Sequence, residues 1–143
     1  MKTILSLVLV VIAIGCSPAQ EKDVYAKKGV AIDGYDAVAY FTDHAAVAGK
    51  EAFHHTWRGT TWYFQSQASL DTFRKDPERY APQYGGYCAF GASRNYKAPT
   101  DPTAFTIVGD KLYLNYNHEV KDTWIKDTTT YIQKADSYWS SLK

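Results

Sequence analysis

The side chain most open to chemistry in this 143-residue chain is the thiol of Cys88, which ends the run Gln83-Tyr84-Gly85-Gly86-Tyr87-Cys88. A thiol can serve as a soft-metal ligand, a redox group or a nucleophile, and free cysteines are also among the most buried residue types. A nucleophilic thiol needs a base beside it. His54 and His118 are candidates, but no spacing places either one next to Cys88. We therefore predict no enzyme activity, and Cys88 either binds a ligand or packs in the core.

Imidazoles are the donors that could join Cys88 in a metal site. His54 and His55 are adjacent in the sequence, and successive side chains of a strand point to opposite faces, so only one of them can face a given site. One thiolate with one or two imidazoles suits copper or zinc, and copper ranks first in affinity. No C-x-x-C or H-x-x-x-H spacing accompanies them. The metal site expected from ligand type is Cys88 with His54 or His55.

Aromatic residues make up 15% of the chain and include twelve tyrosines, enough to build either a core or a flat binding surface. The residues that could line a pocket for a planar or sugar-like ligand are Trp57, Trp62, Tyr63, Tyr84 and Tyr87. Strand alternation sends Trp62 and Phe64 to one face and Tyr63 to the other, so one of these sets belongs to the core. A pocket lined by tyrosines and Cys88 stays an open alternative.

The elements that must position these residues are short. Residues 38–41 alternate as a strand would, and two β-hairpins are expected at Arg58-Gly59 and at Gly109-Asp110, between strands 53–57 and 60–65 and strands 104–108 and 111–116. Ser66 can cap a helix that Pro77 stops or restarts, and Asn117 can cap a long terminal helix. The apolar face of that last helix is expected to comprise Val120, Trp124, Tyr131, Ala135, Tyr138 and Trp139. The predicted class is α+β: small antiparallel β-hairpins packed with helices and a long C-terminal helix.

The first residues indicate a targeting segment. Lys2 precedes an apolar stretch, and small residues lead to Cys16, a pattern that resembles the bacterial lipoprotein signal. The resemblance implies a signal peptide at 1–15 and acylation of Cys16, and Ser17 in place of Asp implies the outer membrane, facing the periplasm. Residues 16–30 are then a lipidated tether and 31–143 a single domain. The alternative is an ordinary signal peptide cleaved near Ala19.

Net charge and cysteine content restrict the classes of binding partner that we expect. Removing residues 1–15 leaves fifteen basic and fifteen acidic residues, and no basic stripe favours nucleic acid or anionic lipid. With Cys16 acylated, Cys88 has no disulfide partner within the chain, and a free thiol in an oxidising compartment should be buried, metal-bound or functional. The expected partners are the membrane, through the lipid anchor, and either a metal ion or an envelope protein.

The middle of the chain resembles the YHS domain family. The hairpin from Trp57 to Ser66 ends in Phe-x-Ser, and Phe73, Pro77 and Tyr80 follow at the family's F…P…Y spacing. Asp36-Ala37-Val38-Ala39 is similar to the family's opening Asp-Pro-Val-Cys. Further along, Pro82 to Cys88, Asp101-Pro102 and Lys111 to Tyr116 resemble the extension of secreted members. YHS domains often accompany heavy-metal handling, such as copper transport and mercury resistance, and are similar to the metal-sensing TRASH domain.

The chain departs from the metal-binding members at each ligand position. Their cysteines are replaced by Ala39, Gln65 and Ser69, none of which is a good ligand for a soft ion. The expected function is therefore a non-enzymatic binding protein of the bacterial envelope, a lipoprotein linked to heavy-metal (copper) handling through its family context. The alternative is a structural or protein-interaction module at the membrane surface that holds no metal.

Overall fold

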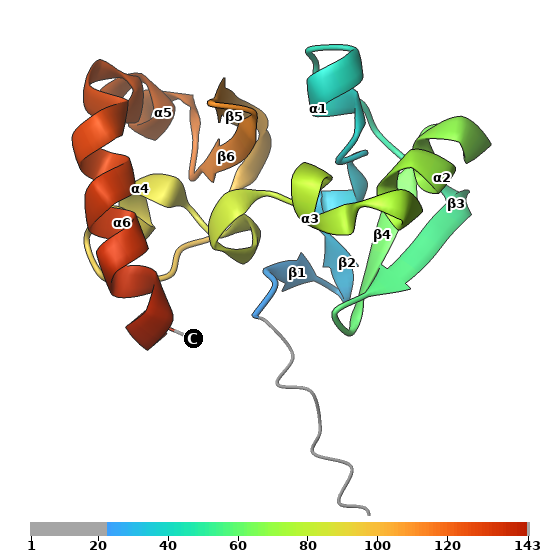
Figure 1. Cartoon of the computed structure of the whole chain (residues 1–143), viewed down its shortest axis with the longest axis horizontal. Coiled ribbons are helices and arrows are strands. Elements are labelled where there is room, and N and C mark those ends of the chain that lie inside the picture. Colours follow the sequence, from blue (N-terminus) through green and yellow to red (C-terminus); the bar gives the residue numbers. More distant parts are fainter. Residues whose placement is uncertain (1–22, 143) are drawn as a thin grey trace, which may run out of the picture.

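A computed structural model describes residues 23–142 of the chain as an α+β fold of small sheets and helices (Figure 1), which confirms the predicted class. The expected signal peptide and the acylated Cys16 lie outside the described residues. Within the described part, none of the helices combines the length and apolar character that a membrane crossing requires.

The N-terminal half is built on a four-stranded sheet of order β1-β2-β4-β3. Its strands are β1 (Ala26–Lys27), β2 (Val30–Ala31), β3 (Lys50–Trp57) and β4 (Thr60–Phe64). The predicted hairpin is confirmed, because β3 and β4 pair antiparallel and Trp57 lies opposite Thr60. Its two-residue turn, Arg58-Gly59, has φ of 50° and 69°, the left-handed conformation that closes a tight hairpin. A short 3-10 turn, η1 (Ile32–Gly34), follows β2.

Three short helices accompany this sheet: α1 (Ala39–Thr42), α2 (Gln67–Lys75) and α3 (Pro77–Tyr80). Ser66 caps α2 as predicted, since its side chain accepts the N–H of Ser69. The strand expected at residues 38–41 is wrong, because this segment begins helix α1. The carboxylate of Asp36 accepts the N–H groups of Val38 and Ala39, and this local bonding favours a helical turn over a strand.

The C-terminal half comprises a hairpin enclosed by helices. Its elements are η2 (Gln83–Gly86), α4 (Ala89–Ser93), β5 (Asp101–Val108), β6 (Lys111–Asn115), α5 (His118–Trp124), η3 (Ile125–Asp127) and α6 (Thr128–Leu142). The predicted hairpin is confirmed, with β5 beginning earlier than expected. Asn117 caps the terminal helical segment as predicted. That segment is two helices rather than one, because the Asp127 side chain accepts the N–H of Thr130 and caps a second start at α6.

The tether predicted for residues 16–30 needs correction in its second half, because residues 23–30 belong to the fold. Ala26 and Lys27 pair with Ala31 and Val30. The N–H of Tyr25 donates to the carbonyl of Gly85 at 2.9 Å. A Cβ on Gly85 would lie 2.0 Å from the carbonyl oxygen of Asp23, so glycine is required for the N-terminal segment to cross η2 at this point.

The core consists of two hydrophobic clusters, the first of which extends from the N-terminal sheet to Leu112 and Leu114 of β6. The first contains Trp62, Phe64 and Phe73 and the second contains Tyr113 and Trp124. The strand prediction is confirmed in that Trp62 and Phe64 are buried while Tyr63 is only half-buried. On the last helix Tyr138 is exposed, contrary to expectation, whereas Trp139 packs against the second cluster.

Tyr40 joins the two halves. Its hydroxyl donates to the carbonyl of Pro102 at 2.8 Å, and its ring meets Phe105 with centroids 4.8 Å apart. Desolvation by burial raises the pKa of Tyr40 far above its ordinary value, so the hydroxyl remains a donor. Helix α1 and strand β5, which are distant in the sequence, are thereby fixed to each other.

The Asp36 carboxylate organises the N-terminal half. It is fully buried, and one oxygen accepts the N–H groups of Val38 and Ala39 at 2.8 and 3.3 Å. The other oxygen accepts the N–H of Gln65 at 2.9 Å and the hydroxyl of Ser69 at 2.6 Å. One side chain thus ties α1, the end of β4 and the first turn of α2 together.

We predict that Asp36→Asn lowers the free energy of unfolding by about 2–4 kcal/mol. The amide places N–H donors where a buried oxygen now accepts donors, so at least one buried group loses its partner. Urea unfolding followed by circular dichroism measures the change. Asp71→Asn, which makes the same substitution at an exposed helical site, should change the value by less than about 0.5 kcal/mol. Equal effects of the two substitutions would contradict the role given to Asp36.

Candidate functional site

The run Gln83 to Cys88 folds as a left-handed turn that separates the two halves of the molecule. Tyr84, Gly85 and Gly86 have φ of 57°, 62° and 85°, and such values are strained for a residue with a side chain. Tyr84 is held there by its hydroxyl, which donates to the Asp136 carboxylate at 2.9 Å. Burial and this hydrogen bond raise the pKa of Tyr84, so the hydroxyl stays protonated. Tyr84 and Gly85 line one cavity and Cys88 lines another.

Cys88 is buried, at 2% exposure, and it caps helix α4. Its sulfur accepts the N–H of Gly91 at 3.4 Å, and its thiol lies 3.6 Å from Asn115 Oδ1, the oxygen that also accepts the N–H of Phe90. Burial raises the pKa of the Cys88 thiol more than these N–H groups lower it. A protonated, buried, hydrogen-bonded thiol fits the packing interpretation of Cys88 rather than an activated one.

The structure does not bring the predicted metal ligands together. His54 is exposed and its Nδ1 lies 2.9 Å from the carbonyl oxygen of Glu51, while the ring of His55 meets Phe73. Burial lowers the pKa of His55, which keeps its imidazole neutral. Both histidines lie on β3, at the opposite end of the molecule from α4 and Cys88 (Figure 1). Across the described residues, no group of three or more His, Cys, Asp or Glu side chains is placed to hold a metal ion.

The three positions that carry cysteines in metal-binding YHS members do come together. The N–H of Ala39, the N–H of Gln65 and the hydroxyl of Ser69 all donate to the carboxylate of Asp36. In this chain the place of a thiolate cluster is therefore filled by one buried carboxylate and its donors. Without the cysteines, this arrangement is suited to holding the fold rather than to binding a soft ion.

A pocket that includes Cys88 is present, with tyrosines other than those expected. Its volume is about 270 Å³, and its lining is Cys88, Phe90, Tyr96, Ala98, Tyr116 and Val120. Tyr96 and Tyr116 are 48% and 54% exposed, so the rim of this apolar pocket is open to solvent. It suits an apolar group more than a polar ligand.

A second cavity, of about 330 Å³, is polar and lies where the two halves meet the N-terminal segment. It is lined by Asp23, Arg58, Glu78, Ala81, Pro82, Gln83, Tyr84, Gly85, Asp136, Trp139 and Ser140. Arg58 pairs with Glu78 and its guanidinium carbon lies 4.0 Å from the ring centroid of Trp57. Of the aromatic residues expected to line a ligand pocket, Tyr84 does so here.

Sequence reasoning missed most of this polar cavity. Asp136 and Trp139 are three residues apart on α6, a spacing that places them on one helical face, and this was the signal available. Nothing in the sequence connects that face with Arg58, which lies in the β3–β4 turn, or with Asp23.

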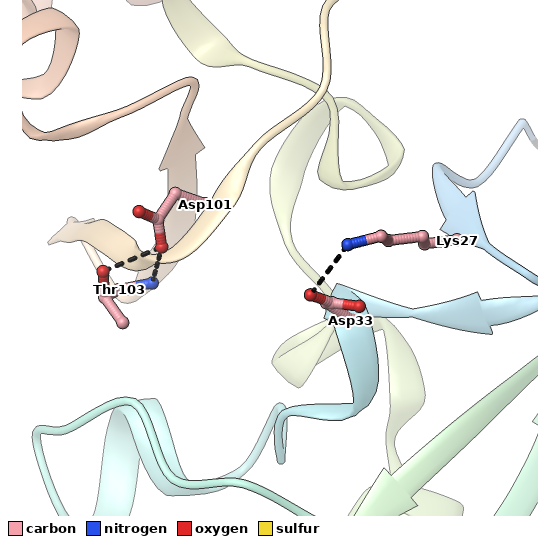
Figure 2. A network of polar contacts seen from close by, with 4 residues as sticks. All are labelled: Lys27, Asp33, Asp101 and Thr103. Atoms are coloured by element: carbon pink, nitrogen blue, oxygen red, sulfur yellow. Dashed lines mark hydrogen bonds and ion pairs between the residues drawn. The ribbon is translucent and has the colours of Figure 1, made fainter.

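A smaller polar cluster lies near the start of β5. Asp101 accepts both the N–H and the hydroxyl of Thr103 at 2.8 Å, and Figure 2 shows this pair beside the separate ion pair of Lys27 and Asp33. The N–H bond lowers the pKa of Asp101. His118 Nε2 lies 2.8 Å from the Thr103 hydroxyl oxygen. These bonds fix the irregular start of β5, where the register with β6 shifts between Asp101 and Phe105.

We predict that Cys88 reacts with a thiol reagent such as DTNB at least ~100-fold more slowly in the native protein than in urea, because the thiol is buried and protonated.

Substitutions of Cys88 test its packing and capping role. Cys88→Ser keeps a side chain that can cap α4, whereas Cys88→Ala should lower the free energy of unfolding by about 1–2 kcal/mol. The pKa of the Cys88 thiol is higher in the native protein than in the unfolded chain, where it is near 8.5. The protonated thiol therefore contributes to stability below about pH 8.5, and this contribution is lost as the pH rises further. The stability advantage of the native protein over Cys88→Ser should therefore shrink from pH 7 to pH 10. Fast native labelling at pH 7 would contradict the assignment.

The comparisons with known proteins address the N-terminal half. Neither the curated proteins nor the solved structures yielded a match. The family model of the YHS domain matches residues 38–84, about a third of the chain, from the residue before α1 to the strained Tyr84. The matched range contains the β3–β4 hairpin and all three helices α1, α2 and α3, and it includes Ala39, Gln65 and Ser69. Over residues 38–84, this chain therefore matches the YHS domain family.

Proposed function

We propose that this chain is a non-enzymatic binding protein of the cell envelope, whose ligand occupies the polar cavity between the YHS domain and helix α6. The cavity is the observation that carries the proposal. Its volume of about 330 Å³ lies within the range of small-molecule sites, and its walls come from three separate parts of the chain. An aromatic side chain, carboxylates and a guanidinium converge there, as they do in sites that orient a polar ligand.

The state of Cys88 supports a binding role over catalysis. The pKa of the thiol is raised by burial, its sulfur is hydrogen-bonded to Gly91 of α4 and to Asn115 of β6, and the ring of His118 is hydrogen-bonded to Thr103. Nucleophilic catalysis requires a thiolate or a base that generates one. The acid–base groups of the polar cavity, for their part, are engaged in pairs: Arg58 with Glu78, and Tyr84 with Asp136.

The YHS domain suggests a metal-related binding role, and heavy-metal handling is the finer form of that proposal. In this chain the family's cysteine positions are Ala39, Gln65 and Ser69, and the imidazoles of β3 lie far from Cys88. A link to copper or zinc would therefore run through a partner or a weakly held ion, not through the Cys88–His54 or Cys88–His55 site.

We predict that the mature protein begins at an acylated Cys16. The small residues before Cys16 and the apolar segment before them motivate this anchor, and Ser17 favours the outer membrane. Mass spectrometry of protein extracted from membranes should show an N-terminal peptide carrying a lipid. Cys16→Ser should release the protein from the membrane fraction. A mature N-terminus near Gln20, with no lipid, would favour the ordinary signal peptide and contradict the anchor.

We predict that a small polar compound binds in the cavity and that Ser140→Trp abolishes this binding. Saturation-transfer NMR on the purified protein would compare putrescine, N-acetylglucosamine, glutamate and glycerophosphoethanolamine. Calorimetry would test Cu(I) and Zn(II). Ser140 lines the cavity, so a bulky side chain there occupies its volume. Ser141→Trp is the matched control, because Ser141 is exposed on the same helix and does not line the cavity. Binding that survives Ser140→Trp would place the site elsewhere and contradict the proposal.

The alternative function is a protein-interaction module at the membrane surface. The exposed rings of Tyr96 and Tyr116, which border the apolar pocket beside Cys88, favour it, because tyrosines are enriched in protein interfaces. If no compound of the panel binds, this alternative becomes the better description of the chain.

A further inference from the structure

The charges of the polar cavity come from opposite walls. Arg58 and Glu78 belong to the YHS domain, from the β3–β4 turn and α3, whereas Asp136 and Trp139 belong to α6. Asp23 completes the lining from the N-terminal segment. A ligand that spans the cavity therefore meets a guanidinium on one side and a carboxylate with an aromatic ring on the other.

The wall at Arg58 suits an anionic group. Its guanidinium is stacked on Trp57, which fixes the plane of the group, and it donates to Glu78 from one side. Arginine has five N–H donors in a rigid fork, so a second acceptor can bind beside Glu78. The Arg58 side chain retains 20% exposure, which leaves part of it accessible from the cavity.

The wall at α6 suits an ammonium. The molecule already holds one nearby: Lys97 pairs with Asp23, and its Nζ lies 5.2 and 5.9 Å from the ring centroids of Tyr87 and Trp139. Trp139 also contacts Tyr84, with ring centroids 5.8 Å apart, and the hydroxyl of Tyr84 donates to the Asp136 carboxylate. A carboxylate and the Trp139 ring are thus combined twice, at Asp23, where Lys97 binds, and at Asp136, which lines the cavity together with Trp139.

We propose that the polar cavity binds the zwitterionic headgroup of a membrane phospholipid, in which an ammonium is joined to a phosphate diester. The phosphate lies against Arg58 and the ammonium lies between Asp136 and the Trp139 ring. Arg58 already pairs with Glu78, so a bare cation would leave only its further N–H donors unused, whereas a bare anion would face Asp136; a ligand with both charges can use both walls. The chain that follows the proposed signal peptide has no net charge, so it has no general attraction to an anionic lipid surface.

The N-terminal segment would hold the cavity close to membrane lipids, the source of this ligand. This inference rests on the lipid anchor of the proposed function. Asp23 lines the cavity, and the N–H of Tyr25 holds the segment on Gly85. Seven residue steps connect Cys16 with Asp23, so at most about 25 Å separates the acylated residue from the cavity wall. A headgroup is therefore always within reach of the cavity, at high local concentration.

Calorimetry with soluble glycerophosphoethanolamine tests the chemistry without requiring the anchor. We expect it to bind several-fold more tightly than ethanolamine, which lacks the phosphate, or glycerol 3-phosphate, which lacks the ammonium. Asp136→Asn and Arg58→Gln should each weaken binding about threefold to tenfold, the range for partly exposed charge pairs. Asp110→Asn is the matched control, because it removes an exposed carboxylate in the β5–β6 turn, where Asn tolerates the same left-handed backbone.

Vesicles distinguish the lipid from a free zwitterion. Phosphatidylethanolamine vesicles added to the acylated protein should displace glycerophosphoethanolamine, and phosphatidylglycerol vesicles should not. Displacement by neither would overturn the lipid source, and equal binding of ethanolamine or glycerol 3-phosphate would overturn the two-charge chemistry. If another compound binds the cavity and is blocked by Ser140→Trp while glycerophosphoethanolamine does not bind, the headgroup proposal fails and the proposed binding function stands.

Discussion

The buried carboxylate of Asp36 is the interaction on which the N-terminal half of this chain depends. A charged group without solvent is costly unless its oxygens are satisfied, and here four donors from three segments satisfy them. The carboxylate starts α1, closes the end of β4 and holds the first turn of α2. Two of its donors are the backbone groups of Ala39 and Gln65, and a third is the Ser69 hydroxyl, so the positions at which metal-binding family members carry cysteines share a structural role in this chain.

The second constraint is the left-handed turn at Tyr84, Gly85 and Gly86. It allows the N-terminal segment to cross close to the backbone at Gly85 and directs Cys88 back into the second half of the molecule. The strain at Tyr84 is offset by its bond to Asp136 and its packing on Tyr113. Residues of this run line both cavities, Gln83 to Gly85 the polar one and Cys88 the apolar one.

The two hairpins are the elements that the sequence predicted most directly. Arg58-Gly59 and Gly109-Asp110 lie between alternating aromatic or β-branched runs, and the strands formed where those runs predict them. The caps at Ser66 and Asn117 are equally local. The strand expected at residues 38–41 failed because Asp36 bonds to backbone groups two and three residues ahead, and the tether expected up to residue 30 failed because its partner, Gly85, lies sixty residues away.

The sequence by itself determined the features whose physical causes are local: the hairpin turns, the helix caps, the opposite facing of Trp62 and Phe64 relative to Tyr63, and the resemblance to the YHS family without its cysteines. Only the tertiary structure decided which side chains share a site. It separated His54 and His55 from Cys88, placed Gln65 and Ser69 against Asp36, about thirty residues earlier in the chain, and brought Arg58, Asp23 and Asp136 to one cavity. The reason is that a site depends on the docking of whole elements through the Tyr40 and Tyr84 contacts, and such long-range packing leaves no periodic signal in the chain.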